Sequence, residues 1–181
     1  MLKKILLLIC LLVALSGVAS AEIISEVDEF DNTKYIYSYF RLVGEKTEDI
    51  RIKDLYFRKS ITANSVEYIL MFSNTEVGHG LKDRFSIYND FLIKFDDDNN
   101  EIYTLSRKGE FSHYLDSGFQ QIVLNVPENV ISKILSSDKI TLRIPLDLRH
   151  SGDKYKTRIR NFTFDVSQEM ISEWRQVIQA E

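Results

Sequence analysis

Cysteine, proline and glycine are scarce in this sequence of 181 residues, which has one Cys, two Pro and seven Gly. A single cysteine excludes a fold held together by several disulfides. So little Pro and Gly excludes collagen-like chains and flexible linkers. What the chain does have is 44% hydrophobic and 12% aromatic residues, which excludes intrinsic disorder. The composition therefore indicates an ordinary globular protein.

The first 21 residues have the three-part pattern of a secretory signal peptide. Lys3 and Lys4 form a short positive region before an apolar run over 5–15, and an Ala-Ser-Ala sequence ends at Ala21. The run is shorter than the roughly 20 residues that span a membrane. We predict cleavage between Ala21 and Glu22, with export to the periplasm or the medium. An uncleaved N-terminal anchor is the alternative.

Cleavage changes the charge and the chemistry of the remaining chain. Residues 22–181 form one predicted β-rich globular domain without cysteine, because Cys10 lies in the apolar run. Their 27 acidic residues outnumber 21 basic ones, which argues against general nucleic-acid binding. We expect no transmembrane segment after cleavage, because no second apolar run of about 18 residues follows.

Most of the mature chain alternates between apolar and polar residues with the period of strands. The predicted strands are 34–43, 52–58, 65–73, 85–95, 101–105, 118–126, 139–148 and 155–165. Two segments, 127–135 and 167–179, have the apolar spacing of amphipathic helices, the second at the C-terminus. The fold class is therefore α+β, an antiparallel sheet or β-sandwich with one or two helices. An immunoglobulin-like β-sandwich is the alternative.

Three tyrosines share one face of the first predicted strand. Tyr35, Tyr37 and Tyr39 alternate with Ile36 and Phe40, so the two sets belong to opposite faces. Three tyrosines on one face of a strand make a flat amphipathic surface that suits a sugar or a protein partner. The alternative is ordinary aromatic packing between neighbouring strands.

Basic residues form a second candidate binding surface. Lys156, Arg158 and Arg160 alternate along the last predicted strand, and Arg143 comes from the preceding one. If these strands pair, the cations would form a stripe that binds a carboxylate, a phosphate or an anionic envelope polymer. Phe162 continues the same parity, which indicates that this face changes from solvated to buried or contains a bulge. A solvated face without a ligand is the alternative.

An acidic run, Asp96, Asp97, Asp98 and Glu101, is a candidate Ca²⁺ site because Ca²⁺ prefers several oxygen ligands. Its spacing does not match the loop of an EF-hand. The run lies between two predicted strands, so a plain hairpin loop is the favoured interpretation. Apart from this possible Ca²⁺ site, no cofactor is predicted.

Catalytic motifs are absent from the sequence. His79, His113 and His150 lie in separate segments, and no zinc-protease, nucleophile-elbow or phosphate-loop pattern occurs. The leading hypothesis is an exported, non-enzymatic binding or envelope-associated accessory protein whose partner is a protein or an anionic envelope ligand. An envelope hydrolase or metal-dependent enzyme is one alternative. An inhibitor or chaperone that pairs through a sheet edge is another. The sequence leaves the oligomeric state open.

Overall fold

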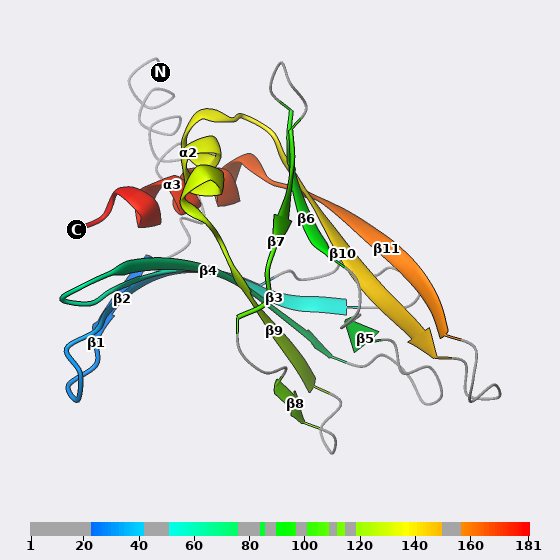
Figure 1. The fold of residues 1–181 in the computed structure, drawn as a ribbon, viewed down its shortest axis with the longest axis horizontal. Helices are drawn as coiled ribbons and strands as arrows, with labels where there is room; N and C mark the ends of the chain where they lie inside the picture. The colour runs from blue at the N-terminus through cyan, green and yellow to red at the C-terminus, as the bar shows by residue number, and fades with distance from the viewer. Residues whose placement is uncertain are drawn as a thin grey trace, which may run out of the picture.

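The computed structural model describes residues 23–41, 51–75, 84–85, 90–96, 101–108, 112–114, 119–149 and 157–181. They form two antiparallel sheets and two helices, so the predicted α+β class is confirmed (Figure 1). The predicted signal peptide and its cleavage site lie outside the described residues. Export therefore stays a prediction.

The larger sheet, sheet A, is an antiparallel meander with two additional strands at one edge. Its strand order is β1-β2-β3-β4-β9-β8. The strands are β1 (Ile24–Val27), β2 (Lys34–Arg41), β3 (Arg51–Ile61), β4 (Val66–Thr75), β9 (Phe119–Asn125) and β8 (Ser112–Tyr114). Four consecutive strands in one sheet differ from the Greek-key order of the immunoglobulin-like alternative. The short strands β1 and β8 are not predicted by the sequence pattern.

The smaller sheet, sheet B, has the order β11-β10-β6-β7, and β5 also pairs with β10. Its strands are β5 (Arg84–Phe85), β6 (Phe91–Phe95), β7 (Ile102–Leu105), β10 (Ile140–Arg149) and β11 (Thr157–Val166). The predicted single strand 85–95 is thus two strands, β5 and β6. Pro145 of β10 lies between the partners of these two strands, since Arg143 pairs with Leu92 and Leu146 with Phe85. The register with β10 therefore differs between β5 and β6.

The alternation predicted for β10 is confirmed. Ile140, Leu142, Ile144 and Leu146 are all at most 2% exposed, whereas Arg143 is exposed. The buried face continues into β11, where Phe164 is the partner of Leu142. These side chains form the inner face of sheet B.

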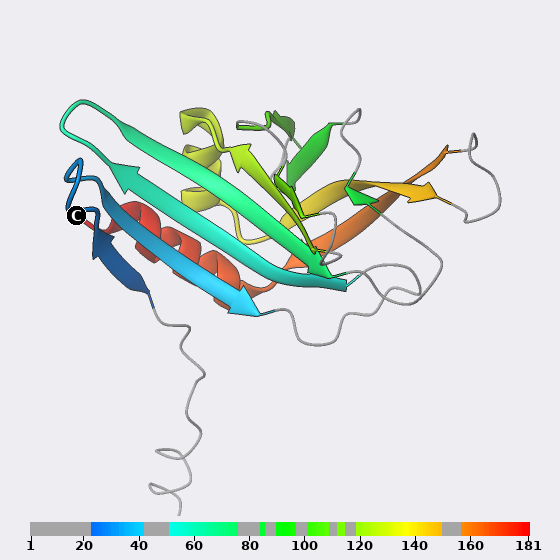
Figure 2. The same cartoon turned by 90° about the horizontal axis from the view of Figure 1, so that it is seen from below.

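The two helices α2 (Glu128–Ser136) and α3 (Gln168–Gln179) lie on the same side of sheet A as sheet B (Figure 1). The hydroxyl of Ser167 caps α3 by accepting a hydrogen bond from the backbone N–H of Met170 at 3.2 Å, which satisfies a free N–H of the first turn. Pro127 is the N-cap residue of α2. Figure 2 shows α3 running along sheet A, where it contacts β2 and β3.

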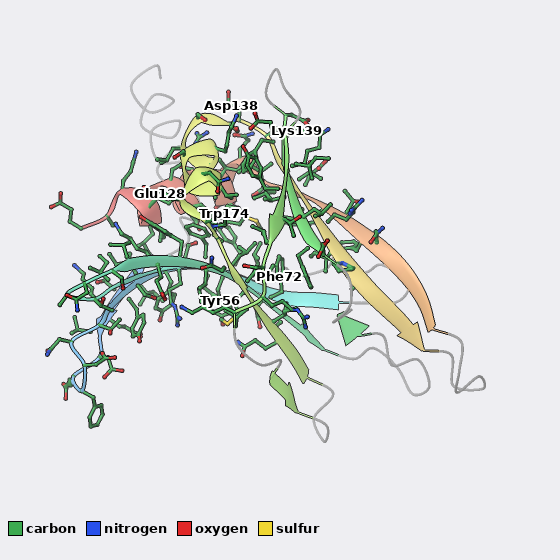
Figure 3. The ribbon with its side chains drawn as sticks, viewed as in Figure 1. Tyr56, Phe72, Glu128, Asp138, Lys139 and Trp174 are labelled. Atoms are coloured by element: carbon green, nitrogen blue, oxygen red, sulfur yellow. The ribbon has the colours of Figure 1, made fainter. Side chains whose placement is uncertain are left out.

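One core joins both sheets and both helices. The ring of Trp174 in α3 stacks on Phe57 of β3, with 5.2 Å between their centroids. The largest fully buried side chains are Trp174, Phe57, Phe72, Phe91, Phe95, Leu55, Leu70, Ile93, Ile122, Leu124 and Ile134. Trp174 and Tyr56 lie on opposite sides of sheet A (Figure 3). No helix in the described ranges is long and apolar enough to cross a membrane.

The chain crosses from sheet B to sheet A directly after β7. Arg107 forms a bridge with Leu124 of β9. The backbone N–H of Lys108 donates to the carbonyl of Val123 at 2.9 Å, and that of Asn125 donates to Ser106 at 2.7 Å. The chain itself and these hydrogen bonds therefore connect the two sheets at the same place.

Candidate functional site

The outer face of sheet A, the face away from the helices, carries the three tyrosines predicted from the sequence. Tyr35, Tyr37 and Tyr39 are each partly exposed, whereas Ile36 and Ser38 on the other face are 2% and 0% exposed. The predicted separation of the two faces of β2 is therefore confirmed.

Strand register places residues from β3 and β4 beside these tyrosines. Tyr37 pairs with Arg58, and Arg58 pairs on its other side with Ile69. In an antiparallel pair, directly opposite residues share a face. The residues that line the resulting hollow of about 370 Å³ are Glu26, Tyr35, Tyr37, Tyr56, Arg58, Ile69 and Met71. We call this set the tyrosine platform.

Arg58 is the cation of the tyrosine platform. Its guanidinium carbon lies 4.8 Å from the centroid of the Tyr35 ring, within the range of a cation–π contact. Its Nε atom is buried and has no hydrogen-bond partner among the described residues. A buried donor without an acceptor is costly, and the guanidinium that carries it lines the hollow beside Tyr35.

Two phenol groups of the platform keep their protons at neutral pH. Burial raises the pKa of Tyr37, and the hydrogen bond that its hydroxyl donates to Glu26 Oε1 at 2.9 Å raises it further. Burial also raises the pKa of Tyr56, with a further contribution from the charge of Asp54. Both hydroxyls are therefore O–H groups that can donate as well as accept hydrogen bonds.

Tyr39 has a packing role rather than a place in the hollow. Its ring centroid lies 4.7 Å from that of Tyr56. Its hydroxyl donates to Asp54 Oδ1 at 2.8 Å, and Ser73 Oγ donates to the other oxygen of this carboxylate at 2.7 Å. Asp54 is only 6% exposed, so these bonds stabilise a buried charge. The cross-strand packing considered as the alternative thus describes Tyr39.

The floor of the platform is apolar. Ile69 is 2% exposed although it lies outside the core between the two sheets. Met71 lies beside it and accepts a hydrogen bond at Sδ from Gln121 Nε2 at 2.7 Å. The predicted burial of both faces of strand 65–73 agrees with these positions.

The predicted basic stripe is divided by the strand register. Arg143 pairs with Thr163, whereas Arg158 and Arg160 pair with Leu148 and Leu146. Adjacent positions of a strand belong to opposite faces, so Arg143 is not on the face of positions 158 and 160. Lys156 and the side chains of Arg158 and Arg160 lie outside what the structure describes. Their anion-binding role stays a prediction.

The acidic run contributes ion pairs at its two described ends. Asp96 lies 2.7 Å from Lys139 Nζ and 3.1 Å from Lys94 Nζ. Glu101 lies 2.9 Å from Lys133 Nζ. Hydrogen bonds from Lys139 and then Lys94 hold the pKa of Asp96 below its ordinary value.

The other two residues of the candidate Ca²⁺ site, Asp97 and Asp98, lie outside the described residues. Within the described ranges, no three His, Cys, Asp or Glu side chains group as metal ligands. The Ca²⁺ site therefore stays a prediction, and lysines pair with both of its described carboxylates.

The structure describes one of the three histidines and an edge of sheet B. His79 and His150 lie outside the described residues, and His113 belongs to β8. β11 forms an edge of sheet B, and β10 is its one strand partner in the described part of the chain. A sheet edge of this kind is what the chaperone or inhibitor hypothesis requires.

The fold and the site define a two-sheet α+β protein with an aromatic hollow on the outer face of one sheet. No protein-family model matches the chain, and no curated protein matches it by sequence. Among solved structures, it is similar to invasion associated protein B from Bartonella henselae, with 8% identity and a TM-score of 0.43. The similarity covers 86% of this chain and 90% of the other. It assigns neither a family nor a function.

Proposed function

We propose that the protein is an exported binding protein of the bacterial envelope, and that the tyrosine platform holds an anionic ligand. The observation that carries this proposal is the guanidinium of Arg58, which lines the hollow and lies over the ring of Tyr35. A guanidinium is always charged and matches the planar geometry of a carboxylate. The predicted signal peptide supports the envelope as the place of action.

The surroundings of Arg58 favour a saccharide that carries a carboxylate. The rings of Tyr35, Tyr37 and Tyr56 offer apolar faces for the C–H surface of a sugar ring. The hydroxyl groups of Tyr37 and Tyr56 and the carboxylate of Glu26 supply donors and acceptors for sugar hydroxyls. Arg58 distinguishes an acidic sugar from a neutral one, because only the acidic sugar supplies a charged acceptor.

Calorimetric titration with trigalacturonic acid tests this proposal, with maltotriose as the neutral trisaccharide. We expect the wild type to bind the acidic sugar and to discriminate against the neutral one. Arg58→Gln should weaken binding by about 10- to 100-fold, since a hydrogen bond to a charged group contributes about 1.5–3 kcal/mol. Arg58→Lys keeps the charge but loses the planar donor pair, so an intermediate affinity is expected.

The control variant is Arg107→Gln, which removes an exposed arginine that does not line the tyrosine platform. It should leave the affinity unchanged, and thermal unfolding should show that each variant is folded. Equal affinity for the two sugars, no measurable binding of the acidic sugar, or equal affinity of wild type and Arg58→Gln would contradict the proposal.

A further inference from the structure

A second hollow lies on the helix-covered side of sheet A, between the β3–β4 hairpin and the two helices. Its volume is about 600 Å³, which is within the range of ligand-binding sites. Lys59 and Tyr68 come from sheet A, Glu128 and Leu135 from α2, and Ile178 from α3. We call this hollow the hairpin groove.

The hairpin groove has an apolar surface that is open to solvent. Val66 is 50% exposed and Leu135 is 39% exposed, and both line it. In the described ranges only five large hydrophobic side chains are exposed, so two of the five border one hollow. Buried Ile131 and Ile178 continue the apolar surface inward. A concentration of exposed apolar side chains in a hollow is typical of a binding site.

Among the charged side chains that line the hairpin groove, the one without an ion pair to a described residue is negative. Glu128 is exposed and has no ion pair among the residues that the structure describes. Lys59 also lines the groove, but its ammonium donates to the carbonyl oxygens of Ile178 at 2.9 Å and Ala180 at 2.6 Å. Glu67 forms an ion pair with Lys108. The groove therefore favours an apolar ligand with a positive charge beside it.

A short sheet edge runs along the hairpin groove. β9 ends at Asn125, which pairs with Ile69, whereas β4 already begins at Val66. The last bond on this side joins the N–H of Val126 to the carbonyl of Tyr68 at 2.9 Å. Among the described strands, Val66 and Glu67 therefore have a neighbour only in β3. The backbone groups of Glu67 point to Ser60 of β3, whereas those of Val66 point to the open side. An extended peptide can add to such an edge through its backbone.

We propose that the hairpin groove binds an extended peptide segment with one large apolar side chain flanked by Lys or Arg. The apolar side chain contacts Tyr68 and Leu135, and the peptide backbone pairs with the edge at Val66. The basic neighbours of the apolar residue pair with Glu128. This site is separate from the tyrosine platform, since no residue lines both hollows.

Selection from a random heptapeptide library displayed on phage tests the proposal. We expect enrichment of peptides with an aliphatic or aromatic residue flanked by Lys or Arg. A synthetic peptide of the enriched sequence should shift the amide NMR signals of Val66 and Glu67. Glu128→Gln should weaken its binding at least about fivefold, and Leu135→Asn should weaken it by a similar factor, because each removes one recognised feature.

The matched control is Glu169→Gln, which removes an acid from the first turn of α3 instead of α2. This variant should bind the peptide as the wild type does. Dodecylamine carries the same charge and an apolar chain but no peptide backbone, so it should bind more weakly than the peptide. No enrichment, enrichment of acidic peptides, equal binding of dodecylamine, or no effect of the two groove variants would overturn the proposal.

Discussion

The ammonium nitrogen of Lys59 in β3 lies 2.9 Å from the carbonyl oxygen of Ile178 at the end of α3. The same nitrogen lies 2.6 Å from the carbonyl oxygen of Ala180. The last carbonyl groups of a helix lack partners within the helix and carry a partial negative charge. Lys59, which is 9% exposed, therefore satisfies these carbonyls and fixes the end of α3 on sheet A.

Replacing Lys59 should destabilise the protein. Lys59→Met keeps much of the apolar stem but leaves two carbonyls without their charged donor, so we expect a loss of about 1.5–3 kcal/mol. Urea unfolding measures the change. Lys34→Met is the control, because the Lys34 ammonium donates to Glu181 O in an exposed place and should contribute less than about 1 kcal/mol. Equal effects of the two variants would contradict this role.

Two tyrosines of β2, Tyr39 and Tyr37, should contribute differently to the stability of the fold. Tyr39→Phe removes a hydrogen bond from the buried carboxylate of Asp54, so we expect a loss of about 1–3 kcal/mol. Tyr37→Phe removes a bond to exposed Glu26 and should change stability by less than about 0.5 kcal/mol. Thermal unfolding of both variants checks the difference. A larger loss from Tyr37→Phe would reverse the assignment.

The ion pairs of Asp96 should be visible as a pH dependence. The pKa of Asp96 lies below its ordinary value of 3.8 because of Lys139 first and Lys94 second. A depressed pKa in the folded state stabilises the fold above the unfolded pKa, and this contribution disappears as the pH falls through the folded value. Carbon-13 NMR of the Asp96 carboxyl should give a midpoint below 3.8.

In Lys139→Met the midpoint of Asp96 should move upward, since the strongest cause of the shift is removed. The pKa of Lys139 is raised by the same contact with Asp96. Replacing Asp96 by Asn should therefore lower the pKa of Lys139. A midpoint that Lys139→Met leaves in place would show that Lys139 does not set this pKa.

Elements with strong periodicity were predictable from the sequence. The segment 139–148 alternates without interruption, and the capping residue Ser167 marks the start of the last helix. β1 and β8 have only four and three residues, so they are too short for a period to be recognised. The division of 85–95 into two strands follows from two different registers with β10, which no local pattern shows.

The candidate site was predictable only in part. Tyr35 and Tyr37 alternate on one strand, so their shared face follows from the sequence. Arg58 and Ile69 come from two other strands, and their place beside Tyr37 depends on register. Alternation of Arg58 with Phe57 in the segment 51–61 is the one local signal that assigns Arg58 to the outer face.

The contact between α3 and sheet A has a consequence for the order of folding. Phe57 is covered by Trp174, which lies 117 positions later in the chain. A chain that has not yet emerged as far as α3 leaves that part of sheet A without its cover. Contacts over such long separations form slowly, because much of the chain must be brought together first. We therefore expect the folding of sheet A and the docking of α3 to be coupled.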